Sequence, residues 1–380
     1  MRSSTLAMSV GTVLLLLGSS ASYADSALQS YVESALAWLQ DRDHNPAIAG
    51  LIQIDGQVAA EAAVGHRALG HPESVRVGDR WHIGSCTKAF TATLLASLAD
   101  RHLLTLDDTL EASLPALAKA MNPAYRRVTI RQLLSHTAGL PQLHDTDEFP
   151  PARRAVRSVQ GLSAQRMALA RFYLTKPPVY AVGTDHYSNL GYIIAGAIAE
   201  ARTGETWEKL MRERVFDPLG ITNVGFGPPG HSGDYDQPLG HGRESGREPL
   251  DPADPENDNP AWIGPAGTIN ISLEDWSKFA QDQLDGALGH GKLLQQATYK
   301  ALQTPVAENY ALGWGTALNS DGSLKSLTHE GSNGVWFAGI VIYPEKRTII
   351  LATTNFGGAV AQKSVEDFVV GMEKHLNLAK

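Results

Sequence analysis

The amino-acid sequence predicts an α+β fold, an α/β sandwich whose antiparallel sheet is built from both ends of the chain and flanked by helices. Strand-like apolar segments occur near the N-terminus and again beyond residue 310, whereas helical spacing dominates about residues 106–285. The economical arrangement pairs the two groups of strands in one sheet and places a mostly helical subdomain beside it. We expect a site in the cleft between the two.

The composition is that of a globular protein, and we assign residues 25–380 to a single domain. Of the 380 residues, 43% are hydrophobic and 19% are charged, so the chain can bury a large core. The formal net charge is −8 and no basic run occurs, which argues against nucleic acid as a partner. No segment beyond the N-terminus reads as a stable membrane span.

The first 24 residues have the pattern of a cleavable signal peptide. Arg2 precedes an apolar run from Val10 to Leu17, and small residues end at Ala24. We expect cleavage after Ala24 and a secreted or periplasmic protein, because the apolar run is too short to span a bilayer. An exported chain whose only cysteine is Cys86 has no internal disulfide.

The elements of the sheet region are predicted at both ends of the chain. Residues 27–41 indicate an amphipathic helix, and residues 47–68 indicate two strands around an Asp55-Gly56 turn. Four further strands are expected in YALGWGTAL, SLTHEG, VWFAGIVIYP and RTIILATTN, and a last helix over residues 362–377.

The middle section is predicted to hold helices and long loops. VTIRQLLSHTAGLP reads as a short helix closed by Gly139 and Pro141, and GYIIAGAIAEARTG as an apolar helix that ends at Gly204. We expect residues 145–154 and 227–260 to be loops that shape a substrate pocket.

Ser85 and Lys88 form the first candidate pair, at the start of a helix whose apolar residues begin at Phe90. They are the only serine and lysine at a spacing of three, and this spacing places both side chains on one helical face. The N–H groups at a helix N-terminus favour a developing anion, and a serine hydroxyl needs a base to become a nucleophile. Two roles are open to Lys88: the base itself, if burial lowers its pKa, or an ammonium that lowers the pKa of Tyr187.

Two further elements complete the constellation. Tyr187 and Asn189 lie in DHYSNLGY, and His329, Gly331 and Ser332 lie in THEGSNGV. The glycine leaves room for a close backbone approach, and the N–H of Ser332 is expected to join that of the nucleophilic serine in an oxyanion hole. The order and spacing of the three elements are more specific than any one of them.

Several segments resemble the serine β-lactamase and penicillin-binding-protein superfamily: GSCTKAFTA, IRQLLSHTAGLP, YSNLGYIIAGAIAE, GPAGTINIS and HEGSNG. Within it they are similar to the branch of class C β-lactamases, D-alanyl-D-alanine carboxypeptidases and related esterases, over about Leu28 to Leu376. The resemblance implies a β-lactamase/transpeptidase-like fold. It also implies that Ser85 is acylated, that Lys88 shuttles or polarises its proton, and that Tyr187 is the general base.

The resemblance further implies that Asn189 hydrogen-bonds Lys88 and the substrate amide. His329 stands where class C β-lactamases carry a lysine, and Glu330 stands where they carry a threonine. A histidine supplies positive charge only near or below its pKa, and Glu330 alternates away from His329 on a strand. Efficient β-lactam hydrolysis therefore does not follow from the resemblance.

Other interpretations of these residues remain open at this point. Cys86 as the nucleophile is disfavoured, because the helix turns it about 100° from the serine; a small buried residue is the better interpretation. His329 is alternatively a structural histidine. The other histidines lack metal-ligand spacing, so we predict neither a metal nor another cofactor. No Gly-x-Ser-x-Gly occurs, which argues against an α/β-hydrolase.

The sequence therefore predicts an exported serine hydrolase that forms an acyl-enzyme on Ser85. The expected substrate is a D-Ala-D-Ala-type peptide, a β-lactam or a small ester. A carboxylesterase or D-amino-acid amidase with the same site is the first alternative. An inactive protein that binds cell-wall peptide is the second, although a pure binder does not need all three of the candidate catalytic residues.

Overall fold

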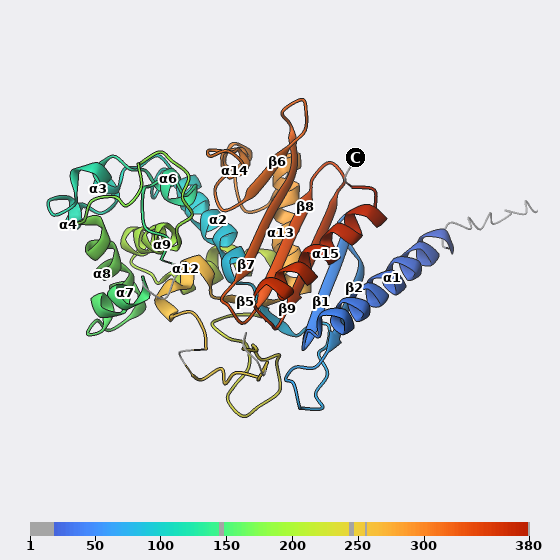
Figure 1. The fold of residues 1–380 in the computed structure, drawn as a ribbon. Helices are drawn as coiled ribbons and strands as arrows, with labels where there is room; N and C mark the ends of the chain where they lie inside the picture. The colour runs from blue at the N-terminus through green and yellow to red at the C-terminus, as the bar shows by residue number, and fades with distance from the viewer. Residues whose placement is uncertain (1–18, 144–147, 243–246, 255–256, 379–380) are drawn as a thin grey trace, which may run out of the picture.

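A six-stranded antiparallel sheet organises the protein (Figure 1). The computed structural model describes residues 19–143, 148–242, 247–254 and 257–378. The strands come from both ends of the chain, as predicted, and their spatial order is β2-β1-β9-β8-β7-β6. Their bounds are β1 Ala47–Ile54, β2 Gln57–Gly65, β6 Gly315–Leu318, β7 Leu324–Ser332, β8 Phe337–Tyr343 and β9 Thr348–Thr354.

The two chain ends meet where β1 pairs with β9. Leu51 lies opposite Leu351 in this antiparallel ladder. On its other side β1 pairs with β2 through the predicted turn, in which Asp55 and Gly56 have φ of 52° and 78°. These positive φ values suit a two-residue hairpin turn, and they explain why this dipeptide marks the turn in the sequence.

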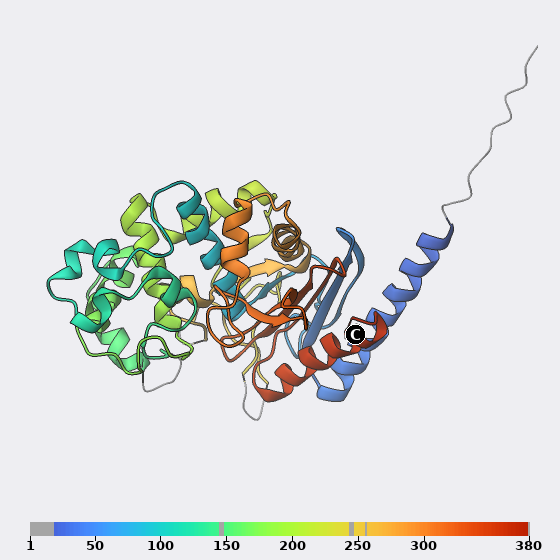
Figure 2. The same ribbon diagram turned by 90° about the horizontal axis from the view of Figure 1, so that it is seen from above.

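Helices cover both faces of the sheet, so its central strands β1, β9 and β8 are mostly apolar. Helix α1 (Ser19–Asp43) and helix α15 (Ala359–His375) lie on one face, and α13 (Leu273–Leu288) lies on the other (Figures 1 and 2). On β9 the side chains alternate between the two cores: Ile350 packs toward α1 and α15, and Leu351 packs toward α13. This double burial is why the centre of this strand, Ile349 to Ala352, is an unbroken apolar run.

The helical subdomain lies to one side of the sheet (Figure 2). Buried Arg166 holds part of it together, because its guanidinium donates to Glu200 Oε1 at 2.6 Å and to the carbonyl oxygen of Trp262 at 3.2 Å. The helices of the middle section and its flanks are α2 Thr87–Asp100, α3 Leu110–Ser113, α4 Pro115–Ala118, α5 Pro123–Arg126, α6 Ile130–Leu134, α7 Phe149–Val156, α8 Leu162–Leu174, α9 Asn189–Thr203, α10 Trp207–Met211, α11 Asp217–Leu219, α12 Gly264–Gly267 and α14 Gln296–Gln303.

A second, three-stranded sheet joins distant segments beside the subdomain. Its order is β3-β5-β4, with β3 Arg80–His82, β4 Val224–Phe226 and β5 Ile269–Ser272. The chain runs from β3 into the turn that carries Ser85, and from α12 into β5. The small sheet therefore brings two segments that are far apart in the sequence against each other.

Some predicted boundaries differ from the structure. Residues 145–154 do not form one loop, because α7 begins at Phe149, where Pro150 and Pro151 suit the first turn of a helix. Helix α1 begins at Ser19, earlier than expected, whereas residues 1–18 of the predicted signal peptide lie outside the described part of the chain. Within the described residues, no helix is both long and apolar enough to cross a membrane.

His241 anchors the long loop that follows β4 to the main sheet. Its buried ring donates from Nδ1 to the carbonyl oxygen of Asn355 at 2.9 Å, and Nε2 accepts from the N–H of Leu69 at 3.1 Å. Burial lowers the pKa of His241 to about 4. The folded state thus holds a neutral imidazole that the unfolded chain would protonate near pH 6.5.

We therefore expect stability to fall as pH falls from about 6.5 to about 4, with this one proton contributing up to about 1.4 kcal/mol per pH unit. Urea unfolding of the wild type and His241→Gln at pH 7, 6, 5 and 4 would measure it. The glutamine variant should lose less stability over this range, because its side chain does not titrate. Parallel stability curves for the two proteins would contradict the assignment.

Candidate active site

Ser85 lies in a tight turn between β3 and α2. Residues Gly84–Cys86 form a single 3-10 turn, and α2 begins at Thr87, so the serine precedes a buried helix as expected. Gly84 has φ of 50°, and a Cβ there would lie 2.5 Å from the backbone nitrogen of Ser332. Glycine is required here because the end of β7 passes directly over the turn.

Lys88 is fully buried beside the serine, and three segments contribute its partners. Its Nζ lies 2.9 Å from Ser85 Oγ, 2.7 Å from Asn189 Oδ1 and 2.7 Å from the carbonyl oxygen of Ala266. Burial lowers the pKa of Lys88 well below its usual range, because the ammonium loses its hydration. An amide oxygen and a carbonyl oxygen are acceptors only, so they take two N–H groups. A neutral amine has only these two N–H groups, so its lone pair is available to accept the hydroxyl proton of Ser85.

Tyr187 faces the serine from the other side. Its hydroxyl donates to Ser85 Oγ at 2.7 Å. Burial raises the pKa of Tyr187, and the hydrogen bond to Ser85 lowers it by a smaller amount. The resting side chain is therefore a phenol. Of the two proton-transfer roles that the sequence left open, these pKa directions favour Lys88 as the resting base and Tyr187 as a proton donor.

His136 holds the segment that carries Tyr187. The N–H of Ser188 donates to His136 Nδ1 at 3.0 Å, the N–H of His186 donates to its carbonyl oxygen at 2.9 Å, and its ring lies 4.4 Å from that of Tyr187. His136 itself adopts φ of 61°, which is uncommon for a residue with a side chain. Sequence reasoning considered this histidine only as a metal ligand and missed its contact with Tyr187, although it lies in one of the segments that carry the resemblance.

Asn189 joins the lysine to the helical subdomain. Its Oδ1 accepts from Lys88, while its Nδ2 donates to the carbonyl oxygen of Leu143 at 3.1 Å. Ser188, and not Asn189, caps helix α9, because its hydroxyl accepts from the N–H of Gly191. The asparagine side chain is therefore free of a capping role and binds the lysine, as predicted.

The end of β7 supplies the second backbone N–H group. A Cβ on Gly331 would lie 2.1 Å from the carbonyl oxygen of Ile83 and 2.6 Å from the backbone nitrogen of Ser85. The backbones of β7 and of the serine turn are thus in contact, and the N–H groups of Ser85 and Ser332 belong to these two adjacent segments. The Ser332 hydroxyl donates to the carbonyl oxygen of Trp336 at 2.7 Å.

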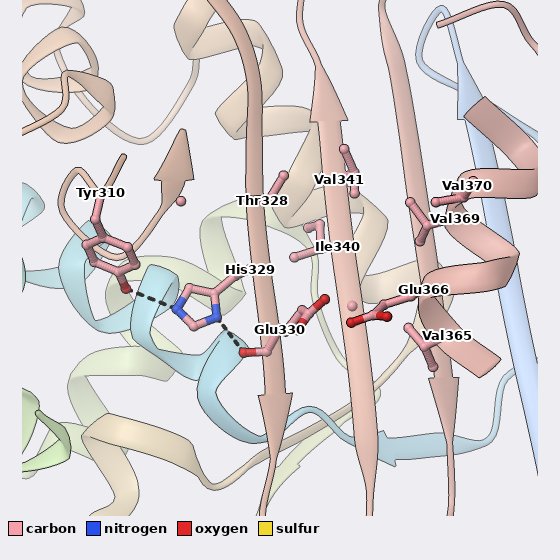
Figure 3. Close-up of a pocket in the computed structure, with 12 residues that line it drawn as sticks. Tyr310, Thr328, His329, Glu330, Ile340, Val341, Val365, Glu366, Val369 and Val370 are labelled. Carbon is pink, nitrogen blue, oxygen red and sulfur yellow. Dashed lines mark hydrogen bonds between the residues drawn. The ribbon is translucent and has the colours of Figure 1, made fainter. Parts of the chain in front are cut away.

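His329 is neutral, and both of its ring nitrogens have hydrogen-bond partners. Its Nδ1 donates to the carbonyl oxygen of Glu330 at 2.6 Å, so Nε2 accepts from the Tyr310 hydroxyl at 3.0 Å (Figure 3). Burial lowers the pKa of His329 to about 3. The residue at the position of the β-lactamase lysine therefore carries no charge at neutral pH.

Glu330 points away from His329, toward Glu366 of α15 (Figure 3). It lines a pocket of about 540 Å³ between β7, β8 and α15, which neither Ser85 nor Lys88 lines. Burial raises the pKa of Glu330, and the nearby Glu366 adds to this effect. Because side chains alternate along the strand, as expected, this carboxylate faces away from the serine.

Cys86 is buried, and it does not share the site. Its Sγ lies 3.5 Å from the carbonyl oxygen of His329, beneath β7, and burial raises the pKa of the thiol well above its usual value. A protonated thiol behind the strand is no nucleophile. Among the described residues, no group of three or more His, Cys, Asp or Glu side chains could hold a metal ion.

We predict that Gly331→Ala lowers kcat/KM toward p-nitrophenyl acetate by about 100-fold, because the added Cβ forces β7 away from the serine turn. Steady-state kinetics on folded protein would measure this loss. Gly371→Ala is the matched control, since a Cβ at this position in α15 meets nothing within 4 Å. Equal activity of the two variants would show that the close crossing is unimportant.

Comparisons with known proteins identify the family of this chain. The model of the β-lactamase family matches residues 28–368. Penicillin-binding protein 4 of Amycolatopsis lactamdurans is 30% identical over 334 residues, which cover 85% of this chain and 84% of that protein.

Two solved structures share the fold. A class C β-lactamase is 19% identical with a TM-score of 0.72, covering 91% of this chain and 96% of its own. EstCE1, described as a hydrolase with promiscuous acyltransferase activity, is 19% identical with a TM-score of 0.73, covering 91% and 99%. Because the family match spans most of its length, this chain belongs to the β-lactamase family, and it is a serine hydrolase of the β-lactamase and penicillin-binding-protein superfamily.

Proposed function

We propose that this protein is an exported serine hydrolase that forms an acyl-enzyme on Ser85 and cleaves small esters or amides. The observation that carries the proposal is the position of Ser85 Oγ, which lies 2.9 Å from Lys88 Nζ and 2.7 Å from the Tyr187 hydroxyl. The backbone N–H groups of Ser85 and Ser332 serve as the oxyanion hole. Export rests on the signal-peptide pattern of residues 1–24.

Acylation follows from the two pKa directions. Neutral Lys88 accepts the Ser85 proton as Oγ attacks the carbonyl carbon, and the oxyanion is stabilised by the two backbone N–H groups. Tyr187 then donates its proton to the leaving group. The lysine Nζ lies 4.8 Å from the centre of the tyrosine ring, so the ammonium stabilises the phenolate and returns the proton to it.

Deacylation uses the same two side chains. A water molecule attacks the acyl carbonyl and transfers its proton to the Lys88–Tyr187 pair, and Ser85 Oγ leaves with a proton from the same pair. Neutral Lys88 is again the base in this step, and the phenol of Tyr187 relays a proton, whereas the family resemblance implies Tyr187 as the general base. The same two side chains thus move one proton in each direction.

The substrate class is suggested by His329. Recognition of a free carboxylate next to the scissile bond, as in D-Ala-D-Ala peptides and β-lactams, is strengthened by a fixed cation. His329 is neutral, and both of its ring nitrogens already have partners. This favours carboxylesters and D-amino-acid amides without such a carboxylate.

A D-Ala-D-Ala carboxypeptidase with weak β-lactam turnover is the second candidate. The 30% identity to a penicillin-binding protein supports it.

Intact-mass spectrometry during incubation with p-nitrophenyl acetate, and separately with a penicillin, tests the proposal. We expect a mass gain of one acyl group from the ester in the wild type and none in Ser85→Ala, because Ser85 is the one serine among the described residues whose hydroxyl contacts both Lys88 and Tyr187. Ser320→Ala, at an exposed turn, should label like the wild type. Acylation that persists in folded Ser85→Ala would contradict the mechanism. The mass of protein recovered after export would also show whether cleavage follows Ala24.

A second experiment tests the neutral His329. We expect His329→Lys to raise kcat/KM for m-carboxyphenyl acetate relative to phenyl acetate by about tenfold, since a charge-assisted hydrogen bond is worth about 1.5–3 kcal/mol. His329→Gln, neutral like the native ring, should leave that ratio unchanged. A wild type that already prefers the carboxylate-bearing ester strongly would contradict the assignment.

A further inference from the structure

Asp258 lies in the long loop between β4 and α12, and its side chain is almost inaccessible to solvent although the described residues around it have no regular structure. Its carboxylate is 7% exposed. Its Oδ1 accepts from Asn333 Nδ2 at 2.6 Å and lies 3.3 Å from His82 Nε2. One carboxylate oxygen therefore contacts two residues that come from opposite ends of the chain.

The first contact leads to the serine turn. His82 ends β3 and is fully buried, and its Nδ1 accepts from the N–H of Gly84 at 3.2 Å. Burial lowers the pKa of His82, so the ring is neutral and its single proton is on Nε2. This N–H has no hydrogen bond among the described residues and faces Asp258 instead. The carboxylate thus selects the tautomer that holds the residue before Ser85.

The second contact leads to the end of β7. Asn333 follows Ser332, and its Oδ1 accepts from the N–H groups of Val335 at 3.2 Å and Trp336 at 3.1 Å. Its amide nitrogen is left for Asp258. The asparagine side chain closes the turn after Ser332, and the carboxylate fixes which way that side chain faces.

The neighbouring residue adds a contact in the same loop. Asn259 Nδ2 donates to the carbonyl oxygen of Gly267 at 2.9 Å. Gly267 follows Ala266, whose carbonyl oxygen accepts from Lys88. Two consecutive loop residues therefore touch the segments that carry the nucleophile, the second backbone N–H group and the lysine acceptor.

We infer that Asp258 is a positioning residue. Through His82 on one side and Asn333 on the other, it fixes the relative position of the two backbone N–H groups of the oxyanion hole. The inference rests on the proposed function. An oxyanion hole works only if its donors are aimed before charge develops, and a displacement of about 1 Å costs about 100-fold in rate. The loop from Gly227 to Pro260 would then support catalysis as well as shape a pocket.

Kinetics of p-nitrophenyl acetate hydrolysis would test this inference. We expect Asp258→Ala to lower kcat by about 10- to 100-fold with little change in KM, because the hole acts on the transition state. Asp258→Asn keeps an acceptor for both contacts and should recover most of the loss. Asp251→Ala is the matched control, an exposed aspartate of the same loop whose carboxylate contacts Ser232 and the N–H of Ala253, and it should act like the wild type.

Inhibition by phenylboronic acid is a second measurement of the oxyanion hole, because the serine oxygen adds to boron and forms a tetrahedral anion. The inhibition constant should rise in Asp258→Ala by about the same factor as kcat falls. A merely structural defect would lower the amount of active protein without weakening the boronate.

If Asp258→Ala does not fold, Asn333→Ala tests the same chain of contacts. It should also lower kcat, and the double variant should lose little more than the larger single loss, since both changes break one chain of contacts.

Ser85-dependent acylation of the wild type decides the proposed function separately. Given that result, the positioning role would be overturned by unchanged kcat and boronate affinity in folded Asp258→Ala, by a loss in Asp258→Asn as large as that in Asp258→Ala, or by additive losses in the double variant.

Discussion

The buried amine of Lys88 is the constraint on which the rest of the structure depends. An ammonium loses its hydration in the core, so a lysine at this position stays only if its N–H groups find acceptors and if its neutral form is useful. Ser85, Asn189 and Ala266 provide the partners, from the turn before α2, from α9 and from α12. These three elements must therefore pack together, and the helical subdomain has to lie beside the sheet.

The second constraint is the contact between β7 and the serine turn. Gly84 and Gly331 are both needed because backbone atoms of one segment occupy the space where a Cβ of the other would lie. Strand β7 is held by β8 and β6, and the turn is held by the small sheet through β3. The catalytic geometry thus arises where two sheets meet, which explains why the long loop that bridges them carries a buried carboxylate.

Neutral histidines are a recurring feature around this centre. His82, His136 and His329 are all buried with lowered pKa, and each uses one ring nitrogen as an acceptor that fixes a neighbouring group. Near Lys88 a charged imidazolium would oppose protonation of the lysine during the reaction. Neutral rings provide orientation without that electrostatic cost.

Much of the fold was predictable because its signals are local. The Asp55-Gly56 turn, the apolar runs of β8 and β9 and the helix that ends at Gly204 each depend on a few neighbouring residues. Helix α7 was missed, since its two prolines resemble loop residues until they are placed in a first turn.

The sequence by itself determined the residue types of the site, because the spacing of Ser85 and Lys88 on one helical face is a local property. Only the tertiary structure decided which side chains reach them and in which protonation state. The pKa of Lys88 is lowered by burial among segments more than a hundred residues away, and that of His329 is lowered by burial in the folded chain. The link from Asp258 to both backbone N–H groups depends on a loop without regular structure. Desolvation and long-range contact have no counterpart in local spacing, and for that physical reason they had to be found in the fold.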